Sequence, residues 1–189
     1  GADQAVEARL FDAALNLVGG AGSSPIVVRT DDAPADAERG VFAPDSDVMT
    51  NGTFVTVYEE FDADRGIEVR GVDGATGAST FNVNVSTSSA VDGREDRDPK
   101  IAALTGGGFV VAWVEEDNPS TSQDNVNFSL HAAGAGAVKA QTAVVNTNFD
   151  FNDVDVIGLA DGGFLIVMTS LTSTRLRFAR FDADGEPSP

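Results

Sequence analysis

Hydrophobic residues recur along this chain in short, almost unbroken runs, each of which begins with phenylalanine after a turn that contains glycine. Three such runs occupy residues 54–60, 109–115 and 164–169, and their phenylalanines are spaced at intervals of 55 residues. A run without polar alternation is typical of a strand that is buried on both faces. The interval therefore predicts one supersecondary unit that is used repeatedly, with each unit burying its apolar surface against the next.

Other strands are predicted on either side of each run, in segments bounded by turn residues. Asn51-Gly52 precedes the first run, and this dipeptide is a strong hairpin signal because both residues tolerate positive φ. Four short strands in each unit of about 55 residues are the signature of a propeller blade. We therefore predict an all-β chain that forms a β-propeller-like array of four-stranded blades. The alternative is a β-sandwich, in which strands alternate as residues 175–181 do.

The repeat makes the chain a single domain whose two ends are incomplete units. We expect a partial blade at 1–40, complete blades at 41–97 and 98–150, and a second partial blade at 151–189. The N-terminal segment resembles the strands that the last unit lacks, so the two ends together are expected to form one further blade. About three blades are fewer than the four to eight of typical propellers. The chain is therefore expected to be a fragment of a longer array or to form a homodimer that closes the ring.

Charge and composition narrow the classes of partner. The net charge is −18, from 30 acidic and 12 basic residues, so we expect no nucleic acid partner, because phosphate contacts need clustered lysine and arginine. Binding to an anionic membrane surface is disfavoured for the same reason, and no apolar run approaches the roughly 18 residues needed for membrane insertion. The chain has no cysteine, which excludes disulfides, zinc–thiolate sites and a cysteine nucleophile.

Two turns place carboxylates two residues apart beside a glycine, which suits a cation that prefers hard oxygen ligands. These candidate metal ligands are Asp62 and Asp64 in one turn, and Asp182 and Asp184 in the other. Neither turn continues into a complete EF-hand loop. The sequence thus predicts calcium as the cofactor, and the alternative is an ordinary hairpin in which aspartate bonds to its own backbone.

Aromatic residues supply the candidate ligand-binding site. Tyr58 and Trp113 occupy the same position of the repeat, and an aromatic ring with a polar edge can stack on a sugar. The alternative is packing between blades. His131 is the only histidine and aligns with Phe181 in the repeat, so we expect it to pack or to lie at the surface rather than to act in catalysis.

Acidic residues close the second strands of two units, at 59–60 and 115–117. Neighbours on a strand point to opposite faces, so these residues are poor acid–base partners within one unit. Carboxylates from neighbouring blades could approach one another, as glycoside hydrolysis requires. Surface charge at strand ends is the simpler interpretation.

Several phrases of this chain resemble repeats in large secreted bacterial proteins. They are Gly107-Gly108-Phe109-Val110-Val111-Ala112-Trp113, Arg180-Phe181-Asp182-Ala183-Asp184-Gly185 and Val144-Val145-Asn146-Thr147. Proteins of that kind often also carry calcium-binding repeats-in-toxin segments, so the resemblance implies an extracellular, calcium-rich setting. It transfers no catalytic site.

Together these inferences predict a secreted or cell-surface protein that is not an enzyme. The expected role is binding or scaffolding by an adhesin-like or lectin-like module, stabilised by calcium, with a cell-surface glycan or protein as its partner. Two alternatives belong to other classes. One is a glycan-active hydrolase or lyase that uses carboxylates at the mouth of the ring, and the other is a purely structural segment of a larger exported protein.

Overall fold

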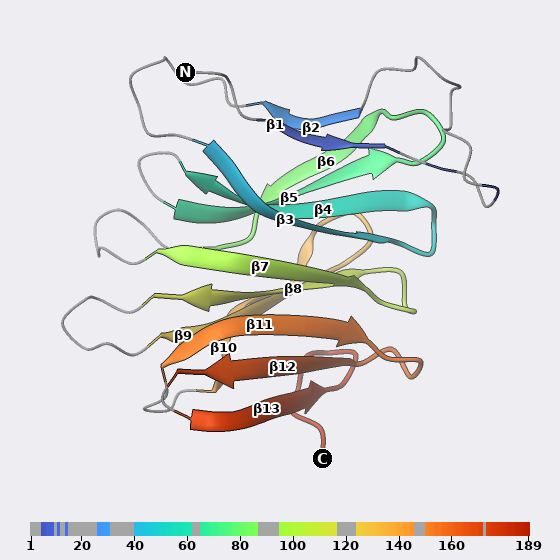
Figure 1. Ribbon diagram of the computed structural model, residues 1–189. Helices are drawn as coiled ribbons and strands as arrows, with labels where there is room; N and C mark the ends of the chain where they lie inside the picture. The colour runs from blue at the N-terminus through green and yellow to red at the C-terminus, as the bar shows by residue number, and fades with distance from the viewer. Residues whose placement is uncertain are drawn as a thin grey trace.

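The computed structural model shows an all-β protein made of antiparallel sheets (Figure 1), which confirms the predicted fold class at that level. The structure describes residues 5–9, 11, 14, 26–30, 40–61, 65–86, 95–116, 124–145, 150–171 and 173–189. No helix in this part of the chain is long and apolar enough to cross a membrane.

The described strands form four sheets, named by their order in the chain. The N-terminal sheet pairs β1 (Ala5–Ala8) with β2 (Ile26–Thr30). The first sheet consists of β3 (Gly40–Val48), β4 (Thr53–Phe61), β5 (Arg65–Asp73) and β6 (Ser79–Asn84). The second sheet consists of β7 (Asp96–Ala103), β8 (Phe109–Glu115), β9 (Asn125–His131) and β10 (Ala137–Val145). The third sheet consists of β11 (Phe151–Gly158), β12 (Phe164–Ser170) and β13 (Ser173–Phe181).

The four sheets stack in chain order, from the N-terminal sheet at one end to the third sheet at the other (Figure 1). Their first strands β3, β7 and β11 lie next to one another along one side of the stack. The described residues form no closed ring, and β1 and β2 pair only with each other. The N-terminal strands therefore do not complete the third sheet as expected, because the first and second sheets separate them from β13.

Strand β8 lies at the centre of the molecule, and all seven of its residues are buried. Its odd-numbered side chains from Phe109 to Trp113 belong to a hydrophobic cluster shared with the first sheet. Its even-numbered side chains from Val110 to Val114 belong to a cluster shared with the third sheet. This confirms that the unbroken apolar run is a strand buried on both faces. Full burial of one large apolar side chain contributes roughly 1.5–3 kcal/mol, so these two clusters hold the stack together.

One kind of turn joins the first and second strands of the three larger sheets. Its glycine has positive φ in every copy, at Gly52 (84°), Gly107 (93°) and Gly162 (92°). Glycine adopts this conformation without the steric cost that a side chain would add. In the first sheet the side chain of Asn51 completes the turn, because its Oδ1 accepts a hydrogen bond from the Thr53 amide at 3.0 Å. The shared turn fixes where each apolar run begins.

Each of the first strands β3, β7 and β11 carries a β-bulge near its start. In β7 the pairing with β8 shifts between Arg97 and Lys100, and Asp98 lies inside this bulge with a φ of 52°. An equivalent bulge in β3 contains Ala43 with a φ of 46°. Both values fall in the left-handed region, which is unfavourable for residues with a side chain. Bulges re-aim side chains at the ends of sheets, and this one brings Arg97 and Asp98 to the end where β8 terminates.

Candidate functional site

The Arg97 guanidinium binds three carboxylates of the second sheet at once. Its Nε donates to Glu116 Oε1 at 2.8 Å, its Nη1 to Asp98 Oδ2 at 2.8 Å, and its Nη2 to Asp124 Oδ2 at 2.7 Å. Glu116 follows β8 and Asp124 precedes β9, so one cation connects three segments of the sheet. The Arg97 side chain is only 18% exposed. Hydrogen bonds between charged groups are stronger than neutral ones, so this contact fixes the ends of the strands.

Arg97 also reaches the third sheet. Its Nη1 and Nη2 donate to the carbonyl oxygens of Asn152 and Phe151, at 3.3 and 3.5 Å. Burial by itself would lower the pKa of Arg97. The hydrogen bonds to Asp98 and Asp124 and the surrounding negative charge outweigh burial and raise this pKa, so the guanidinium stays charged.

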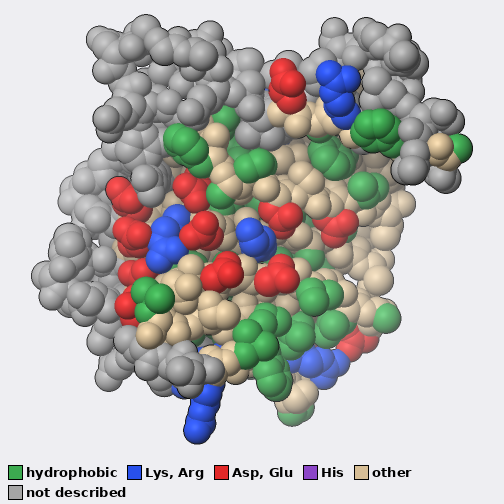
Figure 2. All heavy atoms as spheres, in the orientation of Figure 1, with side chains coloured by type: hydrophobic (Ala, Val, Ile, Leu, Met, Phe, Trp, Pro, Cys, Tyr) green, Lys and Arg blue, Asp and Glu red, His purple; other side chains and the backbone are tan. Residues whose placement is uncertain are grey.

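Further carboxylates of the first and second sheets lie near the bulge of β7, where Asp96 pairs with Glu115. Glu59 Oε1 accepts a hydrogen bond from the Asp98 amide at 2.7 Å, which joins the first sheet to the bulge of β7. Glu59, Asp96 and Glu115 are buried, with 6%, 0% and 8% of their surface exposed. We call the whole set the acidic cluster: Glu59, Asp96, Asp98, Glu115, Glu116 and Asp124. Figure 2 shows acidic side chains gathered around basic ones on the face where β3, β7 and β11 lie.

Carboxylates further along the first strands have a packing role. Asp45 and Asp47 on β3 each accept a backbone amide of β7, from Ile101 at 2.9 Å and from Ala103 at 2.8 Å. These bonds attach the first sheet to the second.

The three carboxylates that bind Arg97 differ in how exposed they are. The side chain of Asp98 is 42% exposed and that of Glu116 is 39% exposed, which are the highest values among the three. These two carboxylates are therefore accessible from solvent.

Sequence reasoning identified only part of this cluster. It noted Glu59, Glu115 and Glu116 at the ends of second strands, but it assigned no role to Arg97, Asp98 or Asp124. Charged residues at the start of β7 interrupt the apolar pattern, so no pattern along the strand marked them.

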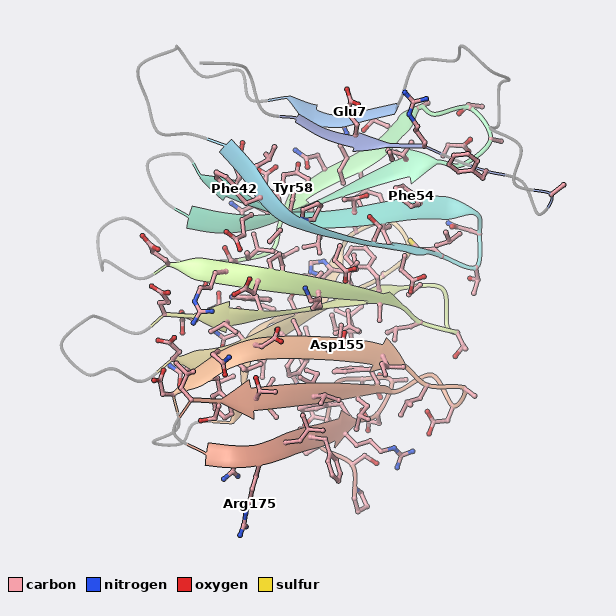
Figure 3. All side chains as sticks on the ribbon, in the orientation of Figure 1. Glu7, Phe42, Phe54, Tyr58, Asp155 and Arg175 are labelled. Atoms are coloured by element: carbon pink, nitrogen blue, oxygen red, sulfur yellow. The ribbon has the colours of Figure 1, made fainter. Side chains whose placement is uncertain are left out.

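Tyr58 and Trp113, the candidate ligand-binding residues, lie in different hydrophobic clusters and do not meet. Both side chains are 0% exposed, and Figure 3 shows Tyr58 enclosed among the strands of the first sheet. The Tyr58 hydroxyl donates to Glu68 Oε2 at 2.9 Å, and Trp113 Nε1 donates to Asp96 Oδ1 at 2.9 Å. A fully buried ring offers no face to a sugar in solvent, so the structure gives both residues a packing role.

The candidate metal ligands lie apart from the acidic cluster or outside the described residues. Asp182 Oδ1 accepts hydrogen bonds from the amides of Asp184 and Glu186, at 3.0 and 2.9 Å, as a hairpin turn requires. Asp62 and Asp64 lie outside the described residues. Among the residues that the structure describes, no group of three or more acidic or histidine side chains is arranged to hold a metal ion. Calcium binding stays a prediction.

His131 packs inside the molecule, which is one of the two positions that the sequence predicted for it. Its ring is 5% exposed and stacks on Phe109 with centroids 4.9 Å apart. Nδ1 lies 3.2 Å from the Ala135 carbonyl oxygen, and Nε2 lies 2.9 Å from Ser129 Oγ. A carbonyl can only accept, so Nδ1 carries the proton and Nε2 accepts from the serine. Burial lowers the pKa of His131 below its ordinary value of 6.5, which keeps the ring neutral.

This pKa predicts how stability changes with pH. The unfolded chain binds a proton at His131 near pH 6.5, but the folded chain binds it only at lower pH, so stability falls as the pH drops below about 6.5. We expect His131→Phe to remove that part of the loss, because Phe181 stacks on Phe164 at the equivalent position. Urea denaturation of both proteins between pH 7 and pH 5 measures it. Parallel curves for the two proteins would contradict this assignment.

Comparison with known proteins places the fold but not the family. No protein-family model matches the sequence, and no curated protein matches it. Solved structures do match. An exo-1,5-alpha-L-arabinanase from a bovine ruminal metagenomic library has a TM-score of 0.56 at 11% identity, covering 85% of this chain and 60% of that one. An endo-arabinase from Bacteroides thetaiotaomicron has a TM-score of 0.52 at 13% identity, covering 83% and 66%.

An endo-1,4-beta-xylanase from the same bacterium also matches, with a TM-score of 0.52 at 10% identity, covering 97% of this chain and 74% of that one. Our chain thus spans 60% and 66% of the two arabinan-degrading structures. Identities this low show a shared fold and nothing finer.

These structures correct the prediction that the chain is not an enzyme. That prediction rested on the packing of the apolar repeat, on a resemblance that transfers no catalytic site, and on surface charge as the simpler interpretation of the acidic strand ends. Two arabinan-cleaving enzymes by name and a xylanase share this fold, so a packed repeat of this kind is compatible with an enzyme. The inference from repeat packing to a non-catalytic protein is therefore wrong.

Proposed function

We propose that this chain is a glycan-active hydrolase, or a large part of one, and that the acidic cluster supplies its catalytic carboxylates. The observation that carries the proposal is the meeting of carboxylates at the bulge of β7, three of them bound to Arg97 and one, Glu59, bound to the Asp98 amide from the first sheet. The fold is shared with arabinanases and a xylanase. Sheets stacked in series also fit an arc of a β-propeller better than the two layers of a sandwich.

The two accessible carboxylates have the chemistry that glycoside hydrolysis needs. One carboxyl group protonates the leaving oxygen, and the other either activates water or attacks the sugar directly. Asp98 and Glu116 are both partly exposed, and they accept hydrogen bonds from different nitrogens of the Arg97 guanidinium. Asp98 comes from the bulge of β7, and Glu116 directly follows β8. We assign them as the acid–base pair.

Arg97 is a positioning residue in this scheme. Its planar fork fixes the direction of both carboxylates, and the buried Glu59 holds the Asp98 backbone from the neighbouring sheet. A pair of catalytic carboxylates must keep a defined separation for the reaction to proceed. The connected network provides that rigidity.

Release of reducing sugar from arabinan, xylan and other plant polysaccharides tests the proposal. We expect activity in the wild-type chain and a loss of about 10²- to 10⁴-fold in Asp98→Asn and in Glu116→Gln, the usual effect of removing a general acid or base. The matched control is Glu186→Gln, which removes a 66% exposed carboxylate that pairs with Lys139. Absence of wild-type activity on every polymer, or full activity in both cluster variants, would overturn the proposal. We also propose that the protein is secreted and that its substrate is a glycan outside the cell.

A further inference from the structure

A pocket of about 390 Å³ lies between the N-terminal sheet and the first sheet, apart from the acidic cluster. Ala8 of β1 packs against Val41 and Tyr58, which holds β1 on this face of the first sheet. The volume falls within the range of small-molecule sites. Figure 3 shows Glu7 on β1 and Phe54 on β4 in this part of the molecule. The lining side chains with polar or aromatic groups are Glu7, Arg9, Asp45, Ser46, Phe54 and Thr56.

The polar groups of the pocket include both hydrogen-bond donors and acceptors. The Ser46 hydroxyl donates to Thr56 Oγ1 at 3.1 Å. A hydroxyl that accepts a hydrogen bond keeps its own hydrogen to donate, so Thr56, which is only 2% exposed, can donate to a ligand inside the pocket. Asp45 is held in place, because its Oδ2 accepts the Ile101 amide at 2.9 Å. These contacts give the pocket a fixed polar wall before any ligand binds.

The charges of the pocket favour an uncharged ligand. Arg9 repels a cation, whereas Glu7 and Asp45 repel an anion, as does the net charge of −18. A neutral ligand with many hydroxyl groups can donate to the carboxylates and accept from the guanidinium. Phe54 is half-buried and adds an aromatic face, on which the apolar face of a sugar ring can stack. The combination therefore indicates a sugar.

We propose that this pocket is a glycan subsite, which binds a neutral sugar residue away from the bond that is cleaved. Phe54 supplies the stacking face, Thr56 the buried donor, and Glu7 and Arg9 the contacts at the entrance. The inference rests on the proposed function in taking the ligand to be part of the substrate polysaccharide. Phe54 and Glu59 lie near opposite ends of β4, about 17 Å apart at the usual rise per residue. Different residues of one polysaccharide can therefore occupy the pocket and the acidic cluster.

Isothermal titration calorimetry with arabinotriose and xylotriose tests this proposal. The titrations use Glu116→Gln as the parent chain, so that the proposed activity does not consume the sugars. We expect binding, and a loss of about tenfold in affinity when either Phe54→Ala or Glu7→Ala is added, which is the usual effect of removing one stacking ring or one charged hydrogen-bond partner. Glu7 is exposed, so its variant tests the pocket without disturbing the core.

The matched control is Phe178→Ala, which removes a 74% exposed ring from β13 and should bind like the parent chain. Circular dichroism of each variant establishes that a lost affinity is not lost folding. Choline and trigalacturonic acid serve as a cationic and an anionic probe, and we expect both to bind more weakly than the neutral sugars.

Three results would overturn the proposal: no binding of either trisaccharide, binding that neither Phe54→Ala nor Glu7→Ala weakens, or tighter binding of a charged probe. The outcome is separable from that of the proposed function. Loss of sugar release in the variants of the acidic cluster, without binding at the pocket, removes only the subsite. Binding at the pocket in a chain that hydrolyses no polymer supports the subsite and removes only the proposed catalysis.

Discussion

Replacement of Trp113 by alanine is expected to lower the free energy of unfolding by about 3–5 kcal/mol, the usual cost of truncating a large buried aromatic side chain. Trp113 is 0% exposed on the central strand β8 and packs in the cluster between the first and second sheets. Because domains are stable by only about 5–15 kcal/mol in total, this loss leaves the fold marginal. Urea denaturation followed by circular dichroism measures it, since the substitution removes the only tryptophan.

The variant Trp113→Phe separates packing from hydrogen bonding at this position. Phenylalanine keeps most of the buried ring but removes the Nε1 donor from Asp96, a carboxylate that is 0% exposed. Removing one partner of a buried polar group costs about 1–3 kcal/mol, so this variant should lie between wild type and Trp113→Ala. The control is Leu171→Ala, a 72% exposed residue for which we expect almost no change. Equal losses in all three variants would contradict a core role for Trp113.

The apolar strands of this fold were predictable, because burial on both faces leaves no position for a polar residue to interrupt them. Strand β8 shows this directly. The start of β7 was not predictable in the same way, because it consists of three consecutive charged residues, Asp96, Arg97 and Asp98. Such a run gives no apolar pattern that would indicate a strand. Their place depends on partners from other segments, such as Trp113 for Asp96. A pattern along one strand carries no information about those partners.

The same reasoning explains what could be predicted of the candidate site. Glu59 and Glu115 could be placed at strand ends, because each directly closes an apolar run. Asp124 could not, since it belongs to the cluster only through a 2.7 Å contact with Arg97 across 27 residues of chain. The likeness of the N-terminal segment to the strands of a blade predicted that it joins the last unit, but similar strands can occupy different sheets. The order in which the sheets stack decides which sheet each strand can join, and that order is not visible in the sequence.

The second large effect is expected for Arg97→Gln, which should lower the free energy of unfolding by about 1–3 kcal/mol, the cost of removing one partner from a largely buried polar group. The substitution leaves Asp98, Glu116 and Asp124 close together without their shared cation, and it cuts the bonds to the third sheet. Urea denaturation at neutral pH measures the change.

A matched arginine and a double variant make that prediction specific. Arg180 pairs with Asp161 at the surface, with side chains 40% and 54% exposed, and exposed ion pairs contribute only about 0–1 kcal/mol. Arg180→Gln should therefore be nearly neutral. In the background of Arg97→Gln, adding Asp124→Asn relieves part of the repulsion among the carboxylates, so the two losses should sum to more than the loss of the double variant. Strictly additive losses, or equal effects at Arg97 and Arg180, would mean that Arg97 does not organise the acidic cluster.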